Sequence, residues 1–428
     1  MSDVCTVGVL GCGTVGSAVL RLLTEHAEDI RDRSGCRFDV HRVAVRDLDR
    51  ARDVPLDRDR FTADARTIVD DSSVQVVVEL MGGVEPARSL ILTALRDGKS
   101  VVTANKELLA NHGAELFETA AEAGVDLFFE AAVGGAIPLI RPLMRSLSAE
   151  RLARILGIVN GTTNYVLTRM TEDGMSFGEA LAEAERLGYA ERDPSDDLEG
   201  FDAASKCAIL ASIAFNSRVV AGDVYREGIA SVSPEDIRFA DRLGYVVKLL
   251  AVAELENGEV AVRVHPAMIP RDHPLGAVRD AYNAVFVEGP NVGQLMFYGR
   301  GAGGEPTAVA VLGDLVAAAR NVSRGRRGIE FPWYAERRVR PMERHECQYY
   351  LLLEAVDRPG VLAKVAGAFG QNQVSIKEVW QEGGGEEALL VMITHRANEG
   401  ALQRTVSQLR ALDVVSAVKS VMRVEGVE

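Results

Sequence analysis

Two residues with opposite charge, Asp202 and Lys206, lie four positions apart at the end of an acidic run. On a helix, side chains at this spacing meet one turn apart, so a carboxylate would pair with an ammonium. A positioned ammonium can stabilise negative charge that develops on an oxygen and then donate a proton. A solvated surface pair explains the spacing as well, so this segment alone leaves both interpretations open. The segment 188–206 reads Gly-Tyr-Ala-Glu-Arg-Asp-Pro-Ser-Asp-Asp-Leu-Glu-Gly-Phe-Asp-Ala-Ala-Ser-Lys.

Three glycines near the N-terminus form a GxGxxG pattern, which consists of Gly11, Gly13 and Gly16. The pattern follows an apolar strand expected over 4–10 and begins a helix. In that context the first glycine makes a tight turn, the second lets the backbone approach a pyrophosphate, and the third allows close packing of helix on strand. The helix start at Thr14 and Val15 supplies amide donors and a positive dipole end. The sequence therefore favours dinucleotide binding over an ordinary turn.

Two further segments concern the coenzyme. Arg46 ends the second expected strand and could bind a 2′-phosphate, which favours NADP, whereas the adjacent Asp47 keeps NAD possible. A solvated arginine fits Arg46 equally well. Thr103 and Lys106 follow the fourth expected strand, and the carboxyl ends of such strands face the ligand crevice. Lys106 is thus well placed for chemistry, with a surface lysine as the alternative.

Two loop-like motifs carry polar groups. The run Asn-Gly-Thr-Thr-Asn-Tyr over 160–165 could bind a carboxylate or an ammonium, or it could be a capped helix start. The run Glu-Ala-Ala-Val-Gly-Gly-Ala-Ile-Pro over 130–138 places one carboxylate beside exposed carbonyl groups, which can hold a hard cation. A plain glycine turn explains the second run as well.

The elements that must position these residues follow two patterns. Strands alternate with helices in the first 135 residues, which predicts a doubly wound parallel sheet of the α/β class. Mixed signals from 138 to 300 predict an α+β domain, after which the apolar helix 307–319 returns to the first domain. The expected strands are 4–10, 38–45, 74–80, 100–103, 259–264 and 284–287, and the expected helices are 86–97, 176–187 and 196–215.

The C-terminal part has a different order. Residues 321–346 are rich in arginine with little periodicity, which indicates a linker. The order after it is βαββαβ, a ferredoxin-like plan. Its expected elements are strand 349–355, helix 360–370, strands 374–380 and 388–394, helix 399–412 and strand 414–421.

Composition excludes several classes of protein. The chain has 428 residues, enough for two to four domains, and a net charge of −14 that disfavours nucleic acids and anionic membranes as partners. Five scattered cysteines signal neither a disulfide framework nor a zinc site and fit a reducing cytoplasm. The N-terminal apolar run lacks the basic start of a signal peptide, and no uninterrupted apolar stretch reaches the length of a membrane span.

Taken together and in this order, the glycine pattern, Thr-Ala-Asn-Lys, the 130–138 run, the 160–165 run and the 188–206 segment resemble homoserine dehydrogenase from residue 1 to about 320. Residues 349–424, which contain Asp-Arg-Pro-Gly-Val-Leu at 357–362, resemble an ACT domain. The resemblance implies a Rossmann-type NAD(P) domain over 1–135, completed by a helix near 304–320. It further implies a substrate-binding and dimerisation domain over 136–303, a linker over 321–346 and an ACT domain over 347–428.

The family reversibly interconverts L-homoserine and L-aspartate 4-semialdehyde with NAD or NADP, in the biosynthesis of threonine, methionine and isoleucine. By resemblance, Lys206 is the general acid, Lys106 assists at the nicotinamide end, and Asp202 orients a lysine. The implied substrate residues are Glu191, Asp197, Thr162 and Tyr189, and the implied coenzyme residues are Gly11, Gly13, Thr14, Val15, Gly16, Arg46, Thr103, Lys106 and Gly303. A sodium or potassium ion would bind Glu130 and the carbonyls of Val133, Gly135 and Ile137.

The resemblance also implies threonine as an inhibitor acting through the ACT domain, and a homodimer or homotetramer. Two other functions compete with it. One is a non-catalytic sensor that binds a nucleotide and an amino acid and controls a partner. The other is an aldehyde dehydrogenase that acts through a thioester, which would need an activated thiolate at Cys12 or Cys207.

Overall fold

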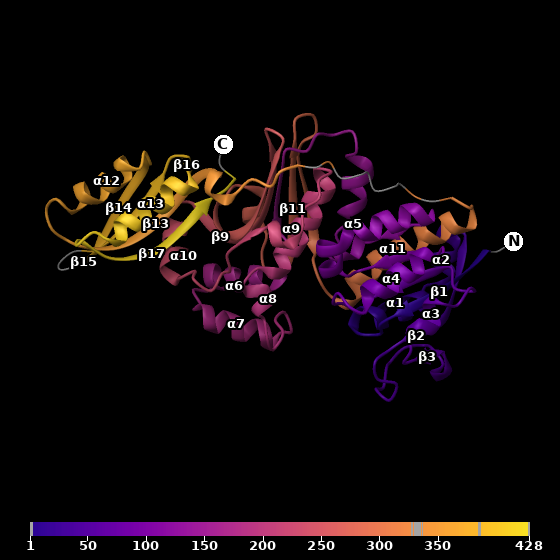
Figure 1. Ribbon diagram of the computed structural model, residues 1–428. Helices are drawn as coiled ribbons and strands as arrows, with labels where there is room; N and C mark the ends of the chain where they lie inside the picture. Colours follow the sequence, from indigo (N-terminus) through magenta and orange to yellow (C-terminus); the bar gives the residue numbers. More distant parts are fainter. Residues whose placement is uncertain (1–2, 327, 329–334, 336, 384–386, 427–428) are drawn as a thin grey trace.

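The computed structural model describes residues 3–326, 328, 335, 337–383 and 387–426. Figure 1 shows three parts in a row, with the indigo and violet N-terminal part at one end, a central sheet, and the yellow C-terminal part at the other end. Within those described ranges, no helix is both long enough and apolar enough to cross a membrane.

The N-terminal part is a six-stranded sheet in which every neighbouring pair is parallel, as the alternation of strands and helices predicts. The strand order is β3-β2-β1-β4-β5-β6, so the order reverses between β1 and β4. In a doubly wound sheet, a ligand crevice forms at this reversal, outside the carboxyl ends of the strands. The strands are β1 (Asp3–Leu10), β2 (Cys36–Ala44), β3 (Phe61–Thr62), β4 (Val76–Glu79), β5 (Ser100–Thr103) and β6 (Leu127–Phe128).

Helices cover this sheet, and one of them comes from far along the chain. The orange helix α11 (Gly304–Ser323) lies among the violet elements in Figure 1. Its buried residues Ala308, Val311 and Leu315 share a hydrophobic core with β1 and β4. The other helices here are α1 (Thr14–Glu25), α2 (Ala27–Ser34), α3 (Arg66–Val69), α4 (Ala87–Arg96) and α5 (Lys106–Ala123).

The central part places helices on a largely antiparallel sheet. Its strands are β7 (Arg154–Ile158), β8 (Tyr225–Arg226), β9 (Tyr245–Glu256), β10 (Glu259–Pro270), β11 (Tyr282–Gly289) and β12 (Gly293–Arg300). Its helices are α6 (Gly161–Glu172), α7 (Phe177–Arg186), α8 (Ser195–Leu198), α9 (Phe201–Ala214) and α10 (Pro234–Arg242). Short turns of 3-10 or π helix span 58–60, 130–132, 142–146, 221–223, 274–277 and 342–344.

The expected single helix over 196–215 is wrong, because it is two helices. The break falls at Glu199 and Gly200, and Gly200 has a φ of +82°, which residues with a Cβ rarely adopt. A Cβ at Gly200 would also press on Val264 and Arg226. The glycine therefore lets the chain turn closely against the sheet before α9 begins.

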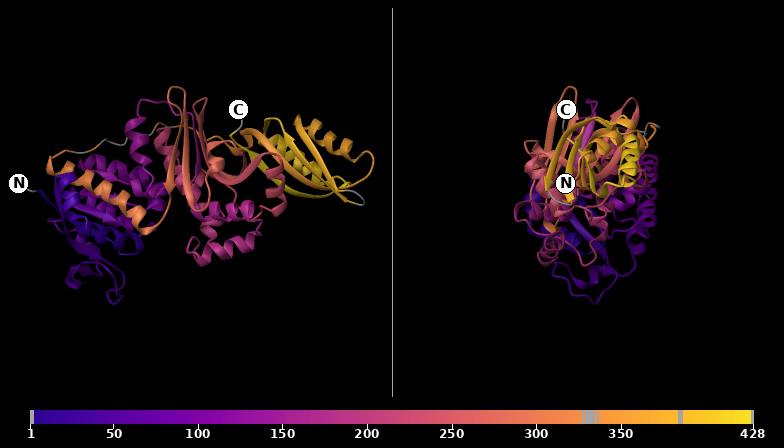
Figure 2. Two further views of the ribbon diagram at one scale, coloured as in Figure 1. Left: turned by 180° about the vertical axis from the view of Figure 1, so that it is seen from behind. Right: turned by 90° about the vertical axis from the view of Figure 1, so that its left-hand side faces the viewer.

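The C-terminal part has the predicted βαββαβ order. Its antiparallel strands run β17-β13-β15-β14 across the sheet. This sheet is not separate, because β17 also pairs with β10 in parallel through Arg423 and Val424, which makes one eleven-stranded sheet with the central part (Figures 1 and 2). The elements are β13 (Glu346–Val356), α12 (Val361–Gln371), β14 (Ile376–Gly383), β15 (Glu387–Thr394), β16 (Ala397–Asn398), α13 (Glu399–Arg410) and β17 (Val415–Val424).

The expected linker over 321–346 is only partly described, since 327, 329–334 and 336 lie outside the described residues. Its first residues continue α11 to Ser323. Near its end, the amide of Val260 donates to the carbonyl of Arg338 at 2.9 Å, and the amide of Arg340 donates to the carbonyl of Val260 at 2.7 Å. The chain is therefore bound along β10 where it enters the C-terminal part.

Candidate active site

Asp202 and Lys206 form a buried ion pair on α9. The ammonium of Lys206 lies 2.7 Å from Oδ2 of Asp202 and 2.7 Å from the carbonyl oxygen of Val159. The two side chains are only 5% and 11% exposed. The interpretation of this spacing as a solvated surface pair is therefore wrong.

A second lysine reaches the same carboxylate from the N-terminal part. Lys106 is the first residue of α5, directly after β5, and its ammonium contacts Oδ1 of Asp202. The side chain of Asn105 caps this helix by accepting from the amide of Leu108 at 3.1 Å. Lys106 is 43% exposed, unlike Lys206. One carboxylate thus joins a buried ammonium and a half-exposed one across the boundary between two sheets.

The three charges shift one another's pKa values. Burial alone would raise the pKa of Asp202, but the positive charges of Lys206 and Lys106 outweigh burial and hold this pKa well below its usual range. Burial lowers the pKa of Lys206, and the attraction of Asp202 only partly offsets it. Burial acts in the same direction on Lys106, but Asp202 outweighs it and raises the pKa of that lysine. The pKa values of the two lysines are therefore shifted in opposite directions, downward for Lys206 and upward for Lys106.

Polar groups from α6 and α8 surround this cluster. The side-chain amide of Asn160 donates to Oδ2 of Asp202 at 2.9 Å and to Oδ1 of Asp197 at 2.6 Å. The hydroxyl of Thr162 lies 2.7 Å from Oδ2 of Asp197 and 2.7 Å from the carbonyl oxygen of Tyr189. The structure therefore brings Thr162, Tyr189 and Asp197 together, and Asn160 connects Asp197 to Asp202; their contact with substrate stays a prediction.

One predicted residue of this region lies outside the cluster, and one residue of the cluster was not predicted. Glu191 is exposed, and no contact among the described residues ties its carboxylate to the cluster. Asn160 was not predicted as a site residue, although it bridges Asp197 and Asp202. Its position before α6, where it accepts from the amide of Thr163 at 2.9 Å, reads in sequence only as a helix cap.

The glycine pattern makes the close approaches predicted for it. Gly11 has a φ of +103°, and a Cβ there would lie 2.6 Å from the carbonyl oxygen of Leu80. A Cβ at Gly16 would overlap the carbonyl of Gly11. A Cβ at Gly13, in contrast, would meet nothing within 4 Å. Gly13 thus leaves open space beside the first turn of α1, which is the shape a bound pyrophosphate requires.

A crevice runs from these glycines along the ends of β1, β2 and β4, lined by Arg46, Asp47, Arg50 and Arg66 among others. The carboxylate of Asp47 accepts from the amides of Asp49 and Arg50 at 2.9 and 3.3 Å. No hydrogen bond or ion pair within the described part of the chain engages the guanidinium groups of Arg46 and Arg66. Among the described residues, Arg46 and Arg66, like Arg50, therefore present unpaired guanidinium groups to the crevice, where Asp47 is occupied with its own loop.

Thr103 is fully buried at the end of β5, and its hydroxyl donates to Glu79 at 2.6 Å. Glu79 also accepts from the amides of Met81 and Gly82 at 2.8 and 3.2 Å. The Thr103 hydroxyl therefore positions the loop that lines the crevice. Glu79 was not predicted, although an acidic residue that ends an apolar strand is the available signal.

Gly303 lies next to the glycine pattern. It precedes α11 with a φ of +120°. The following Gly304 packs so closely on Thr14 that a Cβ would lie 3.0 Å from that side chain. The start of α11 therefore lies beside the start of α1, and the coenzyme contact expected of Gly303 stays a prediction.

The carboxylate of Glu130, which was expected to bind a metal cation, is occupied by backbone amides. Its oxygens accept from the amides of Leu139, Ile140 and Arg141 at 2.6, 2.8 and 2.9 Å. A cation at this loop would therefore be held by carbonyl oxygens. The described hydrogen bonds leave the carbonyls of Val133, Gly135 and Ile137 unused. Among the described residues, no three His, Cys, Asp or Glu side chains gather so that they could hold a metal ion.

The cysteines do not support thioester chemistry. Cys207 is buried within α9, and burial raises the pKa of its thiol to about 12. Cys12 lies with its sulfur 3.4 Å from the hydroxyl of Ser17, on the glycine turn. A thiol that stays protonated at neutral pH is a poor nucleophile, so the geometry disfavours an enzyme that acts through Cys207.

Comparisons with protein families match all three parts of the chain. A model described as "Homoserine dehydrogenase, NAD binding domain" matches residues 11–130, and one described as "Homoserine dehydrogenase" matches 138–316. A model of the ACT domain matches 349–414.

Relatives with that name extend over nearly the whole chain. The homoserine dehydrogenase of Mycobacterium tuberculosis is 51% identical, covering 98% of this chain and 97% of the relative, and that of Corynebacterium glutamicum is 47% identical, covering 98% and 95%. The crystal structure of a homoserine dehydrogenase from Thiobacillus denitrificans matches with a TM-score of 0.94 at 41% identity, covering 99% of both chains. A hyperthermophilic archaeal homoserine dehydrogenase in complex with NADPH matches with a TM-score of 0.60 at 28% identity, covering 74% of this chain and 97% of that one.

Asp202→Asn should lower the free energy of unfolding by about 3–5 kcal/mol at neutral pH, because it leaves the buried Lys206 without its carboxylate. The pKa of Lys206 should then fall further. At pH values between the lowered pKa of Lys206 in the variant and its pKa in the unsubstituted protein, Lys206 has lost its proton in the folded variant. It is still protonated in the folded unsubstituted protein and in both unfolded chains. The stability deficit should therefore shrink as pH rises through that interval.

Urea unfolding of both proteins over a pH series measures the deficit. Asp196→Asn, at an exposed carboxylate next to Asp197 in the same acidic run, is the matched control and should change the free energy by about 0.5 kcal/mol or less. A deficit for Asp202→Asn that does not vary with pH would contradict the buried pair.

Proposed function

The chain belongs to the homoserine dehydrogenase family, with an NAD-binding domain and a C-terminal ACT domain, and on this basis we propose its substrate, ligands and residue roles. It is an NAD(P)-dependent oxidoreductase. We propose that it reversibly interconverts L-homoserine and L-aspartate 4-semialdehyde in the biosynthesis of threonine, methionine and isoleucine. The observation that carries the residue roles is the contact of Asp202 with two lysines from two parts of the chain.

The two lysines take different roles in this proposal. When bound, the coenzyme supplies or accepts the hydride. Lys206 donates a proton to the aldehyde oxygen as negative charge develops there, and takes it back in the reverse direction, which its lowered pKa favours. Lys106 is half-exposed and stabilises the charge on that oxygen beside the nicotinamide end. Asp202 is the residue that positions both ammonium groups.

The substrate's ammonium is assigned to carboxylates. Asp197 presents a partly exposed carboxylate that Asn160 and Thr162 hold in place, and the carbonyl of Tyr189 lies beside it. Glu191 is assigned the same ammonium, which its exposed position leaves it free to contact. Acceptors of this kind suit the amino group that L-homoserine and L-aspartate 4-semialdehyde share.

We propose NADP as the preferred coenzyme. The amides of α1 and the open space at Gly13 suit its pyrophosphate, with Thr14, Val15 and Gly303 alongside. The free guanidinium groups of Arg46 and Arg66 suit a 2′-phosphate, whereas the carboxylate of Asp47 is engaged by its own loop and is poorly placed for ribose hydroxyls.

We also propose a site for a monovalent cation. A sodium or potassium ion would be held by the carbonyl oxygens of Glu130, Val133, Gly135 and Ile137, because the Glu130 carboxylate binds backbone amides.

The proposed domains keep the limits expected from the sequence. They are a coenzyme domain over 1–135 with the helix near 304–320, a substrate-binding domain over 136–303, a linker over 321–346 and an ACT domain over 347–428.

A homodimer or homotetramer is proposed as the working form. Two edge strands of the eleven-stranded sheet carry exposed apolar side chains. These are Met296 and Tyr298 on β12 and Val379 and Trp380 on β14. Edge strands with such side chains pair readily with another copy.

Reduction of NADP⁺ by L-homoserine, with L-threonine and L-serine as control substrates, tests the function. Lys206→Ala should lower kcat by about 10²–10⁴-fold, because the proton donor is lost, and should leave NADPH affinity nearly unchanged. Lys99→Met removes another buried lysine, at the turn before β5, and serves as the matched control with kcat near that of the unsubstituted enzyme. A merely twofold loss of kcat in Lys206→Ala would show that Lys206 is not the proton donor. If the unsubstituted protein binds the coenzyme but turns over no homoserine, the alternative of a non-catalytic sensor would be favoured.

Arg46→Gln should raise the KM for NADP⁺ by about 10–100-fold and leave that for NAD⁺ nearly unchanged, since only NADP⁺ carries the 2′-phosphate. Arg58→Gln is a matched control, because Arg58 is exposed and does not line the crevice. Steady-state kinetics with each coenzyme measure both constants. Equal losses with both coenzymes would contradict a contact to the 2′-phosphate.

L-Threonine should inhibit the enzyme by binding the ACT domain, and D-threonine should not. Initial rates at a series of homoserine concentrations separate the two possible sites. An effector at the ACT domain lowers kcat even at saturating homoserine, whereas threonine in the substrate site would raise only the KM for homoserine. Strictly competitive inhibition would therefore contradict the assignment of threonine to the ACT domain.

A further inference from the structure

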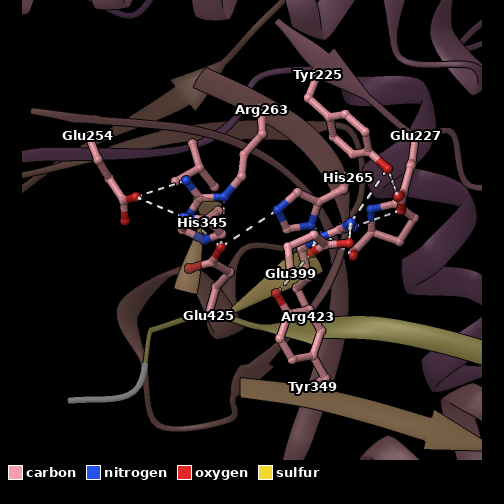
Figure 3. A network of polar contacts seen from close by, with 12 residues as sticks. Tyr225, Glu227, Glu254, Arg263, His265, His345, Tyr349, Glu399, Arg423 and Glu425 are labelled. Atoms are coloured by element: carbon pink, nitrogen blue, oxygen red, sulfur yellow. Dashed lines mark hydrogen bonds and ion pairs between the residues drawn. The ribbon is translucent and has the colours of Figure 1, made fainter. Parts of the chain in front are cut away.

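Two short strand segments meet end to end on one edge of β10. Residues Arg263 and Val264 of β10 pair in parallel with β8, and Ala267 and Met268 pair in parallel with β17. Strand β8 belongs to the central part, whereas β17 is the last strand of the ACT domain. The end of β8 therefore faces the pairing end of β17, and Figure 3 shows the side chains that gather at this junction.

A buried arginine fills the junction. Arg423 of β17 has a side chain only 4% exposed, and its guanidinium contacts Oε2 of Glu227 at 2.9 Å. The same guanidinium contacts Glu399 of α13 through two bonds of 3.0 and 2.8 Å, and the hydroxyl of Tyr349 donates to Glu399 at 2.9 Å (Figure 3). Arg423 thus binds one carboxylate of its own domain and one that follows β8.

The ion pair joins a buried guanidinium to a carboxylate that is partly exposed, with 36% of the Glu227 side chain accessible. Because Arg423 is out of water, losing either of its two carboxylate partners removes part of the compensation for its buried charge. Burial alone would raise the pKa of Glu227, but the positive charge of Arg423 outweighs burial and keeps this pKa below its ordinary value. Arg423 therefore fixes the Glu227 carboxylate, while the amide of Glu227 donates to the carbonyl of Val264 on β10 at 2.8 Å.

The residues on either side of Glu227 touch the turn between α8 and α9. A Cβ at Gly228 would overlap the carbonyl oxygen of Leu198, and the amide of Ile229 donates to that same oxygen at 2.9 Å. On the other side, Arg226 donates to the carbonyl of Glu199 at 3.0 Å and lies 3.3 Å from the ring centroid of Phe201.

That turn separates the two aspartates of the candidate active site. Asp197 lies on α8 and Asp202 lies on the first turn of α9, with Leu198, Glu199, Gly200 and Phe201 between them. A shift of the turn against the sheet would move Asp197 and Asp202 relative to Asn160, which contacts both. A series of direct contacts therefore leads from Arg423 through Glu227 and the α8–α9 turn to Asp197 and Asp202.

We propose that Glu227 and Arg423 are positioning residues for the homoserine site, so that the last strand of the ACT domain holds the α8–α9 turn in its active arrangement. The proposal rests on the function proposed above for the roles of Asp197 and Asp202. It follows that the ACT domain is a structural part of the site. An effector which moves β17 would shift Asp202 as well as Asp197 through this ion pair, and so lower kcat as well as raise the KM for homoserine.

Glu227→Gln tests the proposal because it keeps the shape of the side chain and removes its charge. The KM for L-homoserine should rise by about five- to tenfold, while the KM for NADP⁺ stays within about twofold, since the coenzyme crevice does not touch β8. A general loss of folding would change both constants, so the split between them separates positioning from instability. An unchanged KM for homoserine would overturn the proposal.

Glu382→Gln is the matched control. Glu382 of β14 forms another ion pair between the ACT domain and the central part, with Arg238 and Arg242 of α10 at 2.9 Å each. Among the described residues, neither arginine contacts the α8–α9 turn, so the KM for homoserine should stay within about twofold. An equal rise in both variants would show that any weakened domain contact matters, which would overturn the specific role of Glu227.

A double-variant cycle with Arg423→Gln completes the test. If both residues act through their mutual contact, Arg423→Gln should add little to the KM change in the Glu227→Gln background. Fully additive effects would overturn the coupling, and the Glu227→Gln result decides the proposal alone if the arginine variant does not fold. Absence of homoserine turnover in the unsubstituted enzyme would instead refute the proposed function, so the two failures are distinguishable.

Discussion

The active arrangement depends on one buried carboxylate with two ammonium partners. Asp202, whose side chain is only 5% exposed, cannot remain charged unless Lys106 and Lys206 stay close, and neither lysine can take up an arbitrary position without weakening this contact. Because Lys106 begins a helix of the nucleotide-binding sheet and Lys206 lies on a helix of the central part, the same carboxylate links the two parts, along with the packing of α5 on α9. The cluster proposed for catalysis therefore lies at the contact between the two parts.

The sequence predicted local features well because they depend on neighbours along the chain. Strand β5 has the expected limits, and the ACT-like order of strands and helices is confirmed from alternating apolar patterns. The four-residue spacing of Asp202 and Lys206 likewise needs only helix geometry to predict their contact. The spacing alone could not show how far Asp202 and Lys206 are buried, and burial decides whether they are a solvated surface pair.

Contacts between distant residues were beyond such reasoning. Lys106 and Asp202 are 96 positions apart, and Glu227 and Arg423 are 196 apart, so no periodicity relates them. Glu130 shows the same limit in another form: its carboxylate was expected near a cation, but the following turn directs three backbone amides at it. The break at Gly200 also depends on Val264 and Arg226, which approach it only in the folded chain.

The continuous sheet explains why a regulatory domain can reach the active site without touching it. Strand β10 carries β8 and β17 on one edge and also packs against α9, so it supports both the ACT domain and the helix with Lys206. Buried ion pairs at that edge, including Arg263 with Glu425 at 2.7 Å, give the junction few alternative arrangements (Figure 3). Among them, the pair of Arg423 with Glu227 is the one that joins β17 to the residue after β8. Because the residues on either side of Glu227 contact the α8–α9 turn directly, the proposed role of this ion pair would couple the ACT domain to Asp197 and Asp202.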